Sequence, residues 1–152
     1  MFEILVYLFE NCRQADVSHD PERVARKLSA AGFEESDIST ALHWLAGVVC
    51  APQRSLAPLP DRGLAFRVFA PKELAKLDVE CRGFLLYLEH SGILTPQMRE
   101  HVIERALAAA DNSLALEQLK LIVLMVLWNQ QTPSSQLVTE ELLTARGARL
   151  PN

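Results

Sequence analysis

The feature that most constrains the fold is an apolar stretch, Leu119–Trp128, which has the sequence LKLIVLMVLW and carries one charge, at Lys120. A helix that is apolar on every side is buried, either in a protein core or in a membrane. A bilayer requires about 20 apolar residues, so this run is too short to span one. The helical pattern begins at Leu114, and its length favours a helix over a buried strand. We therefore predict a buried helix over residues 114–128 around which the rest of the chain folds.

Composition limits the class of protein. The chain has 152 residues, of which 49% are hydrophobic and 22% charged, a balance typical of a folded domain and not of a disordered chain. The formal net charge of −4 argues against the positive surface that supports most binding to nucleic acid. Three widely spaced cysteines argue against a disulfide framework or a zinc site and favour a cytoplasmic protein. The apolar N-terminus lacks the basic start and cleavage site of a signal peptide, so we expect it to be part of the fold.

Three helices are predicted before residue 50. The first covers the apolar spacing from Phe2 to Cys12, and the second is capped by Asp20 and stopped by Gly32. The third follows at once, and the pair has the pattern of a helix-turn-helix or of any tight helical hairpin. The predicted apolar face of this third helix comprises Ile38, Ala41, Leu42, Leu45 and Val49.

A proline-containing loop separates these helices from the rest of the chain. It covers Ala51–Gly63 and is followed by Leu64–Phe69, whose alternating pattern predicts a short β element. If Gln53–Ala57 pairs with that element, the N-terminal half is winged-helix-like. If the two segments do not pair, the N-terminal half consists of the three helices and has no wing.

The second half is predicted to be helical throughout. Helices are expected over Lys72–Leu77, Glu80–His90, a segment capped by Thr95, and Gln136–Ala145. Gly83 lies inside the second of these, where glycine costs roughly 1 kcal/mol relative to alanine, and close helix packing is the expected reason. The apolar stripe after Thr95 comprises Val102, Ile103, Ala106, Leu107 and Ala110, and that of the last helix comprises Val138, Leu142 and Leu143.

The predicted fold class is thus mainly α, with about eight helices and one short β element. A helical subdomain over residues 1–70 is expected to join a second one over residues 71–152, which surrounds the central helix 114–128. The two are expected to form one compact unit.

A protein-binding site is the first functional candidate. Trp44 lies at the edge of the apolar stripe of its helix, beside an acidic first turn formed by Glu34, Glu35 and Asp37. An exposed tryptophan can anchor a partner while the acidic groups steer its approach. The alternative is that Trp44 covers the core of its own hairpin.

A direct nucleic-acid contact is the second candidate. The helix over residues 35–49 contains none of the Arg, Lys, Asn or Gln side chains that make most base contacts, so groove reading there is disfavoured. Arg99 and Arg105 on a later helix are the alternative contacts. Glu100 and Glu104 beside them favour instead a solvated face of mixed charge.

Catalysis has the least support. The four histidines lie on separate elements and form no metal-ligand pair, and no nucleophile or phosphate-loop motif is present. Cys81 beside Arg82 could have a lowered thiol pKa, although an inert core cysteine is the alternative. The sequence predicts no catalytic, cofactor-binding or metal-binding residue.

Several segments, in order along the chain, resemble the bacterial Smg family. They include MFEILVYLFE at residues 1–10, RVFAPKE at 67–73, CRGFL at 81–85 and VIERAL at 102–107. The resemblance extends from Met1 to about Leu143. It implies a small cytoplasmic protein whose gene, in many bacteria, lies beside that of a DNA-processing protein, and it implies no catalytic residue. The turn around Gly32 also resembles, over a short segment, the helical modules of RecX-type regulators and of ubiquitin-associated domains.

Together these observations predict a non-enzymatic cytoplasmic interaction or adaptor protein linked to nucleic-acid metabolism. The expected partner is a protein, with no membrane involvement and no cofactor, and the oligomeric state is left open. The alternatives are a direct nucleic-acid binder of helix-turn-helix or winged-helix type and, third, an enzyme.

Overall fold

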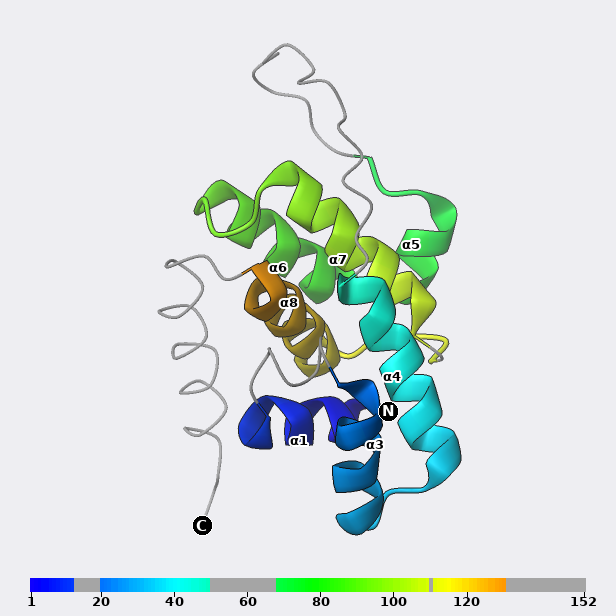
Figure 1. Ribbon diagram of the computed structural model, residues 1–152. Helices are drawn as coiled ribbons and strands as arrows, with labels where there is room; N and C mark the ends of the chain where they lie inside the picture. The colour runs from blue at the N-terminus through cyan, green and yellow to red at the C-terminus, as the bar shows by residue number, and fades with distance from the viewer. Residues whose placement is uncertain (13–19, 50–67, 110, 131–152) are drawn as a thin grey trace, which may run out of the picture.

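The computed structural model describes residues 1–12, 20–49, 68–109 and 111–130, and this part of the chain contains seven helices (Figure 1). These are α1 (Phe2–Asn11), α3 (Pro21–Ala30), α4 (Glu35–Val49), α5 (Pro71–Lys76), α6 (Val79–His90), α7 (Pro96–Ala108) and α8 (Leu116–Gln130). The prediction of a mainly α fold is confirmed. The eighth predicted helix, Gln136–Ala145, lies outside the described residues.

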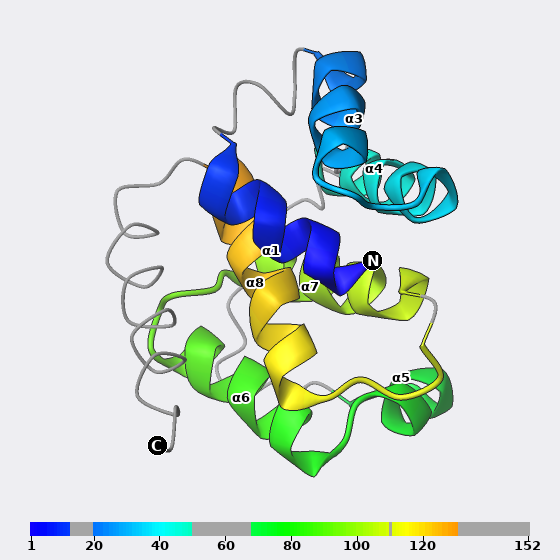
Figure 2. The ribbon, with the colours of Figure 1, turned by 90° about the horizontal axis from the view of Figure 1, so that it is seen from below.

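Helix α8 is the centre of the fold. It packs against α1, α4, α6 and α7, which surround it in both views (Figures 1 and 2). Every residue of Leu119–Leu127 is buried except Lys120, which pairs with Glu117 at 3.0 Å. Trp128 is half-buried, and its ring meets that of Phe9 edge to face at 5.8 Å. The prediction of a buried central helix is confirmed.

The α3–α4 hairpin is set by local signals. Asp20 Oδ1 accepts a hydrogen bond of 3.0 Å from the Arg23 N–H at the start of α3. Gly32 ends the helix with φ +98°, a left-handed conformation that glycine adopts without penalty. The Phe33 N–H then donates to the Leu28 carbonyl at 3.2 Å, as in a Schellman ending. The predicted capping and stop of this helix are confirmed.

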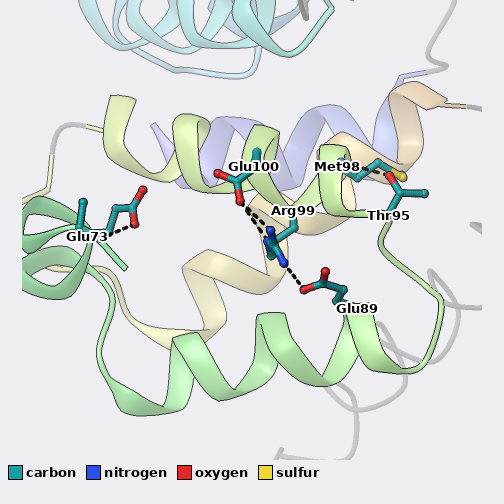
Figure 3. Close-up of polar contacts among 7 residues, drawn as sticks. Glu73, Glu89, Thr95, Met98, Arg99 and Glu100 are labelled. Atoms are coloured by element: carbon teal, nitrogen blue, oxygen red, sulfur yellow. Dashed lines mark hydrogen bonds and ion pairs between the residues drawn. The ribbon is translucent and has the colours of Figure 1, made fainter. Parts of the chain in front are cut away.

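The α6–α7 hairpin follows the same plan. The Asp78 carboxylate accepts from the Cys81 N–H at 2.8 Å at the start of α6, and Gly92 has φ +74° just beyond its end. Thr95 Oγ1 accepts from the Met98 N–H at 3.2 Å at the start of α7 (Figure 3). Each hairpin is therefore a capped helix, a left-handed glycine and a second helix.

The segments that precede α6 and α8 are joined by backbone contacts. Leu77 and Leu114 form an isolated parallel bridge, and the Leu114 N–H donates to the Lys76 carbonyl at 2.9 Å. The buried Cys81 thiol donates to the Leu114 carbonyl at 3.5 Å. Burial, followed by the hydrogen bond with Asp78, raises the pKa of this thiol to about 12. The idea of an activated cysteine is therefore wrong, and its alternative, an inert core thiol, is right.

Two of the predicted apolar faces differ from the observed ones. In α4, Trp44 and Val48 are buried because α4 turns them toward α7 and α8. Val49, which was predicted to be buried, is exposed. In α7, Val102, Ile103 and Ala106 are buried as predicted, but Leu107 is exposed. In each case the preceding residue, Val48 or Ala106, is buried, so the core lies on that side of the helix.

The predicted β element and wing lie mostly outside the described residues. Of Leu64–Phe69, only Val68 and Phe69 are described, and neither is in a strand. The described residues contain no strand, so the β element is not confirmed there, and the predicted wing over Gln53–Phe69 lies outside them except for Val68 and Phe69. Helices from both sides of residue 70 contribute to one cluster of buried residues. The division at residue 70 stays a prediction.

The central helix gives the first testable prediction. Leu124 is 4% exposed, so Leu124→Ala is expected to lower the free energy of unfolding by about 2–5 kcal/mol. Leu86, which is 44% exposed on α6, supplies a matched control, and Leu86→Ala is expected to change it by about 0.5 kcal/mol or less. Urea unfolding of the two variants measures the difference. Equal effects would contradict the burial of α8.

Candidate functional site

The structure places Trp44 in the core. Its side chain is 3% exposed, and its indole Nε1–H donates to the Arg105 carbonyl of α7 at 3.0 Å. The ring is therefore buried, and its only hydrogen-bond donor, the Nε1–H, is satisfied within the protein. The hypothesis that Trp44 is an exposed anchor is wrong. The side chain is buried, as the alternative also expected, but its indole N–H reaches α7, outside the hairpin formed by α3 and α4.

The acidic turn remains at the surface. Glu34, Glu35 and Asp37 are all exposed around the start of α4. Carboxylates there also stabilise the helix, because they lie near the positive end of its dipole. Without the tryptophan as an anchor, a partner-binding role for these three residues stays a prediction.

Arg99 and Arg105 do not present a free basic surface. The Arg99 guanidinium pairs with Glu89 of α6 and, at 2.9 Å, with Glu100 (Figure 3). Arg105 lies 3.5 Å from Glu104, and both arginine side chains are largely buried, at 12% and 15% exposed. Their charges are thus compensated within the chain, which weakens the nucleic-acid alternative built on them.

A group of polar side chains instead closes the C-terminal end of α4. The Val48 carbonyl accepts from Asn129 Nδ2 of α8 at 3.1 Å and contacts His101 Nε2 of α7 at 3.3 Å. The Trp44 carbonyl accepts from Arg105 Nη1 at 3.4 Å. The Val48 carbonyl is one of the last four of α4 and lacks an intrahelical partner, whereas the Trp44 carbonyl lies a turn earlier. Cations near this end are favoured by the helix dipole. We call His101, Arg105 and Asn129 the α4 C-terminal cluster, and it links three helices through backbone oxygens.

Gly47 makes room for this cluster. A Cβ atom at this position would lie 1.7 Å from Arg105 Nη1, so only glycine lets the guanidinium lie against the backbone of α4. Arg105 Nε is buried and finds no hydrogen-bond partner among the described residues. The sequence contained a signal, since a glycine within an apolar helix often marks a close approach, but the approaching group could not be identified.

His101 is held in its neutral form. Burial lowers its pKa, Arg105 lowers it further, and the Val48 contact and Glu104 oppose the shift. Since a carbonyl can only accept, the contact with Val48 requires the Nε2–H tautomer. This histidine therefore acts as a neutral donor to the end of α4.

Lys76 has a comparable structural role at another helix end. Its Nζ donates to the Leu107 carbonyl at 3.1 Å and to the Ala109 carbonyl, just beyond α7. Burial lowers its pKa, and Asp111 opposes the shift. The lysine thereby connects α5 to the end of α7, and its ammonium group has a structural role as a hydrogen-bond donor.

An apolar surface that no prediction had placed lies on α6. Val79, Leu86 and Tyr87 are 75%, 44% and 64% exposed, and they lie with the exposed Gly83 at helical spacings that share one side. The opposite side of α6 is buried, and the helix lies at the edge of the bundle (Figure 2). No described residue lies within 4 Å of a Cβ placed at Gly83, so the close packing predicted there is not observed in this part of the chain. We call Val79, Gly83, Leu86 and Tyr87 the α6 face.

The described residues thus define a small helical protein with a buried central helix and one exposed apolar helix face. They contain no group of three side chains able to hold a metal ion. Nor is any described helix both long and apolar enough to cross a bilayer.

Comparison with known proteins identifies the family. Residues 1–150 match the family described as "Protein of unknown function (DUF494)". The chain is 49% identical over 150 residues to the Smg homolog of Aromatoleum aromaticum, which covers 99% of this chain and 97% of the relative. It is 44% identical to the Smg homolog of Bordetella petrii, over 98% of each chain, and 46% identical to that of Methylococcus capsulatus, over 86% and 83%. The chain belongs to this bacterial Smg family, as its sequence indicated. No solved structure matches it significantly.

The contact between Gly47 and Arg105 can be tested by a double-mutant cycle. In an Arg105→Ala background, Gly47→Ala is expected to raise the free energy of unfolding by up to about 1 kcal/mol, because alanine is the better helix former. With Arg105 present, the new methyl group must displace the guanidinium, and a coupling of about 1 kcal/mol should cancel the gain. Urea unfolding of the four proteins measures the coupling. Additive effects would contradict it.

His101 predicts a dependence of stability on pH. Its folded-state pKa lies below the ordinary value of 6.5, so the unfolded chain binds the proton first as the pH falls. Stability should therefore decrease on acidification from about pH 7 to about pH 5. His101→Gln keeps a donor for Val48 but does not titrate, so its decrease should be smaller. Urea unfolding at both pH values compares the two proteins, and equal decreases would exclude His101 as a source.

Proposed function

We propose that this protein is a non-enzymatic binding protein, an adaptor, and that the α6 face is where a protein partner docks. The observation that carries the proposal is the exposure of Val79, Leu86 and Tyr87 together on one side of a helix whose other side is core. Exposed contiguous apolar side chains mark interaction surfaces, and tyrosine is enriched among the residues that dominate binding energy.

The α6 face suits this role better than the turn predicted from sequence. A docking surface needs apolar area that water currently covers, and Trp44 offers none because it is buried. Glu34, Glu35 and Asp37 carry charge without an adjoining aromatic side chain, and charge supplies steering more than affinity. They remain candidates for guiding approach.

The non-enzymatic part of the proposal is supported by how the reactive groups are used. Cys81, Lys76 and His101 each contact a backbone carbonyl at the end or start of a helix. Burial is the largest cause of the shifted pKa of each of these three groups, so the shifts do not require a catalytic role. A cytoplasmic location and a link to nucleic-acid metabolism stay predictions.

The test is affinity purification from an extract of the native bacterium with matched variants. Tyr87→Ser and Leu86→Ser should lower recovery of the specific partner by roughly tenfold or more, the loss expected of an interface anchor. Leu107→Ser, which changes a similarly exposed leucine on α7, should leave recovery unchanged. Thermal unfolding should be alike in all variants. Equal recovery with all three would reject the α6 face as the docking surface.

A further inference from the structure

The α6 face has polar neighbours on the same side of its helix. Glu80 near the start of α6 and His90 at its end are both exposed. At about 100° per residue, these two residues and the α6 face lie within about 120° of the helix circumference. The exposed side of α6 therefore has a carboxylate near one end, an imidazole at the other, and a glycine and two apolar side chains between them.

This order of side chains is complementary to its own reverse. In a two-fold symmetric interface the same patch of both copies meets, so each contact occurs twice. We infer that a second copy of this chain docks on the α6 face, with the two α6 helices antiparallel and the two-fold axis midway between Gly83 and Tyr87. Another protein that docks on this face must displace the second copy. That competition rests on the proposed function, and the self-contact does not.

Gly83 and Tyr87 supply the match in shape. They are four residues apart, so an antiparallel copy brings each Tyr87 to the level of Gly83 in the other copy. Tyr87 is 64% exposed, and no described residue lies within 4 Å of a Cβ placed at Gly83, which leaves room there for a ring. The two copies of Leu86 differ in level by about 3 Å and meet beside the axis. The glycine, which is unfavourable within a helix, then has a packing reason.

Charge decides between the two possible directions of the helices. In the antiparallel pair, Glu80 of each copy lies at the level of His90 of the other, because the two residues are equally far from the axis. The imidazole N–H can donate a hydrogen bond to the carboxylate. A parallel two-fold pair would instead bring the two Glu80 side chains to one level, and like charges placed together oppose association.

The size of the surface predicts a weak dimer. Val79 and Tyr87 are about 12 Å apart along α6, so this helix offers far fewer than the roughly 20–30 residues per side of a stable interface. Small interfaces, below about 1,200 Å² in total, are typical of transient complexes. The dimer should therefore exchange with the monomer, which leaves the α6 face accessible to another protein.

Analytical ultracentrifugation of the purified full-length protein over a concentration series tests the inference. The average mass should rise from that of the monomer toward that of the dimer. Leu86→Ser and Tyr87→Ser should each raise the dissociation constant by roughly tenfold or more. Gly83→Gln should also raise it without lowering thermal stability, because glutamine is the better helix former and would meet no described residue at its Cβ. Leu107→Ser on α7, a similarly exposed leucine, is the matched control and should leave the dimer unchanged.

The antiparallel arrangement has its own test. Glu80→Arg and His90→Asp should each weaken the dimer, because each removes the contact between the two ends of α6. An equal mixture of the two variants should associate several times more strongly than either variant alone. In the mixed dimer the introduced arginine faces the introduced aspartate, and the other end keeps the original pair.

Three results would overturn the inference: a monomer at every concentration, a dimer that Leu86→Ser and Tyr87→Ser leave intact, or a mixture that associates no better than its components. The purification test above is read separately. If the chain is monomeric and Tyr87→Ser still lowers partner recovery, the inference fails and the proposed function stands. If the dimer forms as inferred but Tyr87→Ser leaves recovery unchanged, the proposed docking role fails and the self-contact stands.

Discussion

The fold depends on the burial of one helix on all its sides. Leu119–Leu127 is apolar almost throughout, and no single neighbour can cover a helix of that kind. Helices α1, α4, α6 and α7 are all needed to cover it, which brings distant parts of the chain together. The two capped hairpins supply four helices with one apolar side each, and three of these four helices are used directly against α8.

Polar contacts then fix how the helices meet. Carbonyls at the ends of α4 and α7 accept hydrogen bonds from side chains of other helices, namely His101, Arg105, Asn129 and Lys76. At Val48 and Leu107 these contacts satisfy carbonyls that lack a partner within their own helix and would be costly to bury unpaired. They also account for the histidine, the lysine and Arg105, which could otherwise suggest catalysis or nucleic-acid binding, while Arg99 pairs with Glu89 and Glu100. Among the described residues, the α6 face is one surface that has no such role.

Local signals explain why so much of the secondary structure could be predicted. Asp20, Gly32, Thr95 and the stretch Leu119–Trp128 act over a few residues, so their effects follow from sequence alone. Side-chain exposure does not, because it depends on which neighbour covers which side. Trp44 was expected at an edge and is buried, since its indole finds the Arg105 carbonyl, which is distant in sequence. Val49 and Leu107 were expected to be buried and are exposed, whereas the residues that precede them, Val48 and Ala106, are buried.

The sequence by itself determined the mainly helical class, the buried central helix, the two hairpins and the family, because periodicity, capping and similarity are properties of the chain. Only the tertiary structure decided where a surface is left open. Leu85, Leu86 and Tyr87 are consecutive apolar residues of α6. The helix turns Leu85 to the core and leaves Leu86 and Tyr87 exposed to solvent. That choice is made by the packing of α7 and α8 against one side of α6, and no local signal in the sequence encodes it.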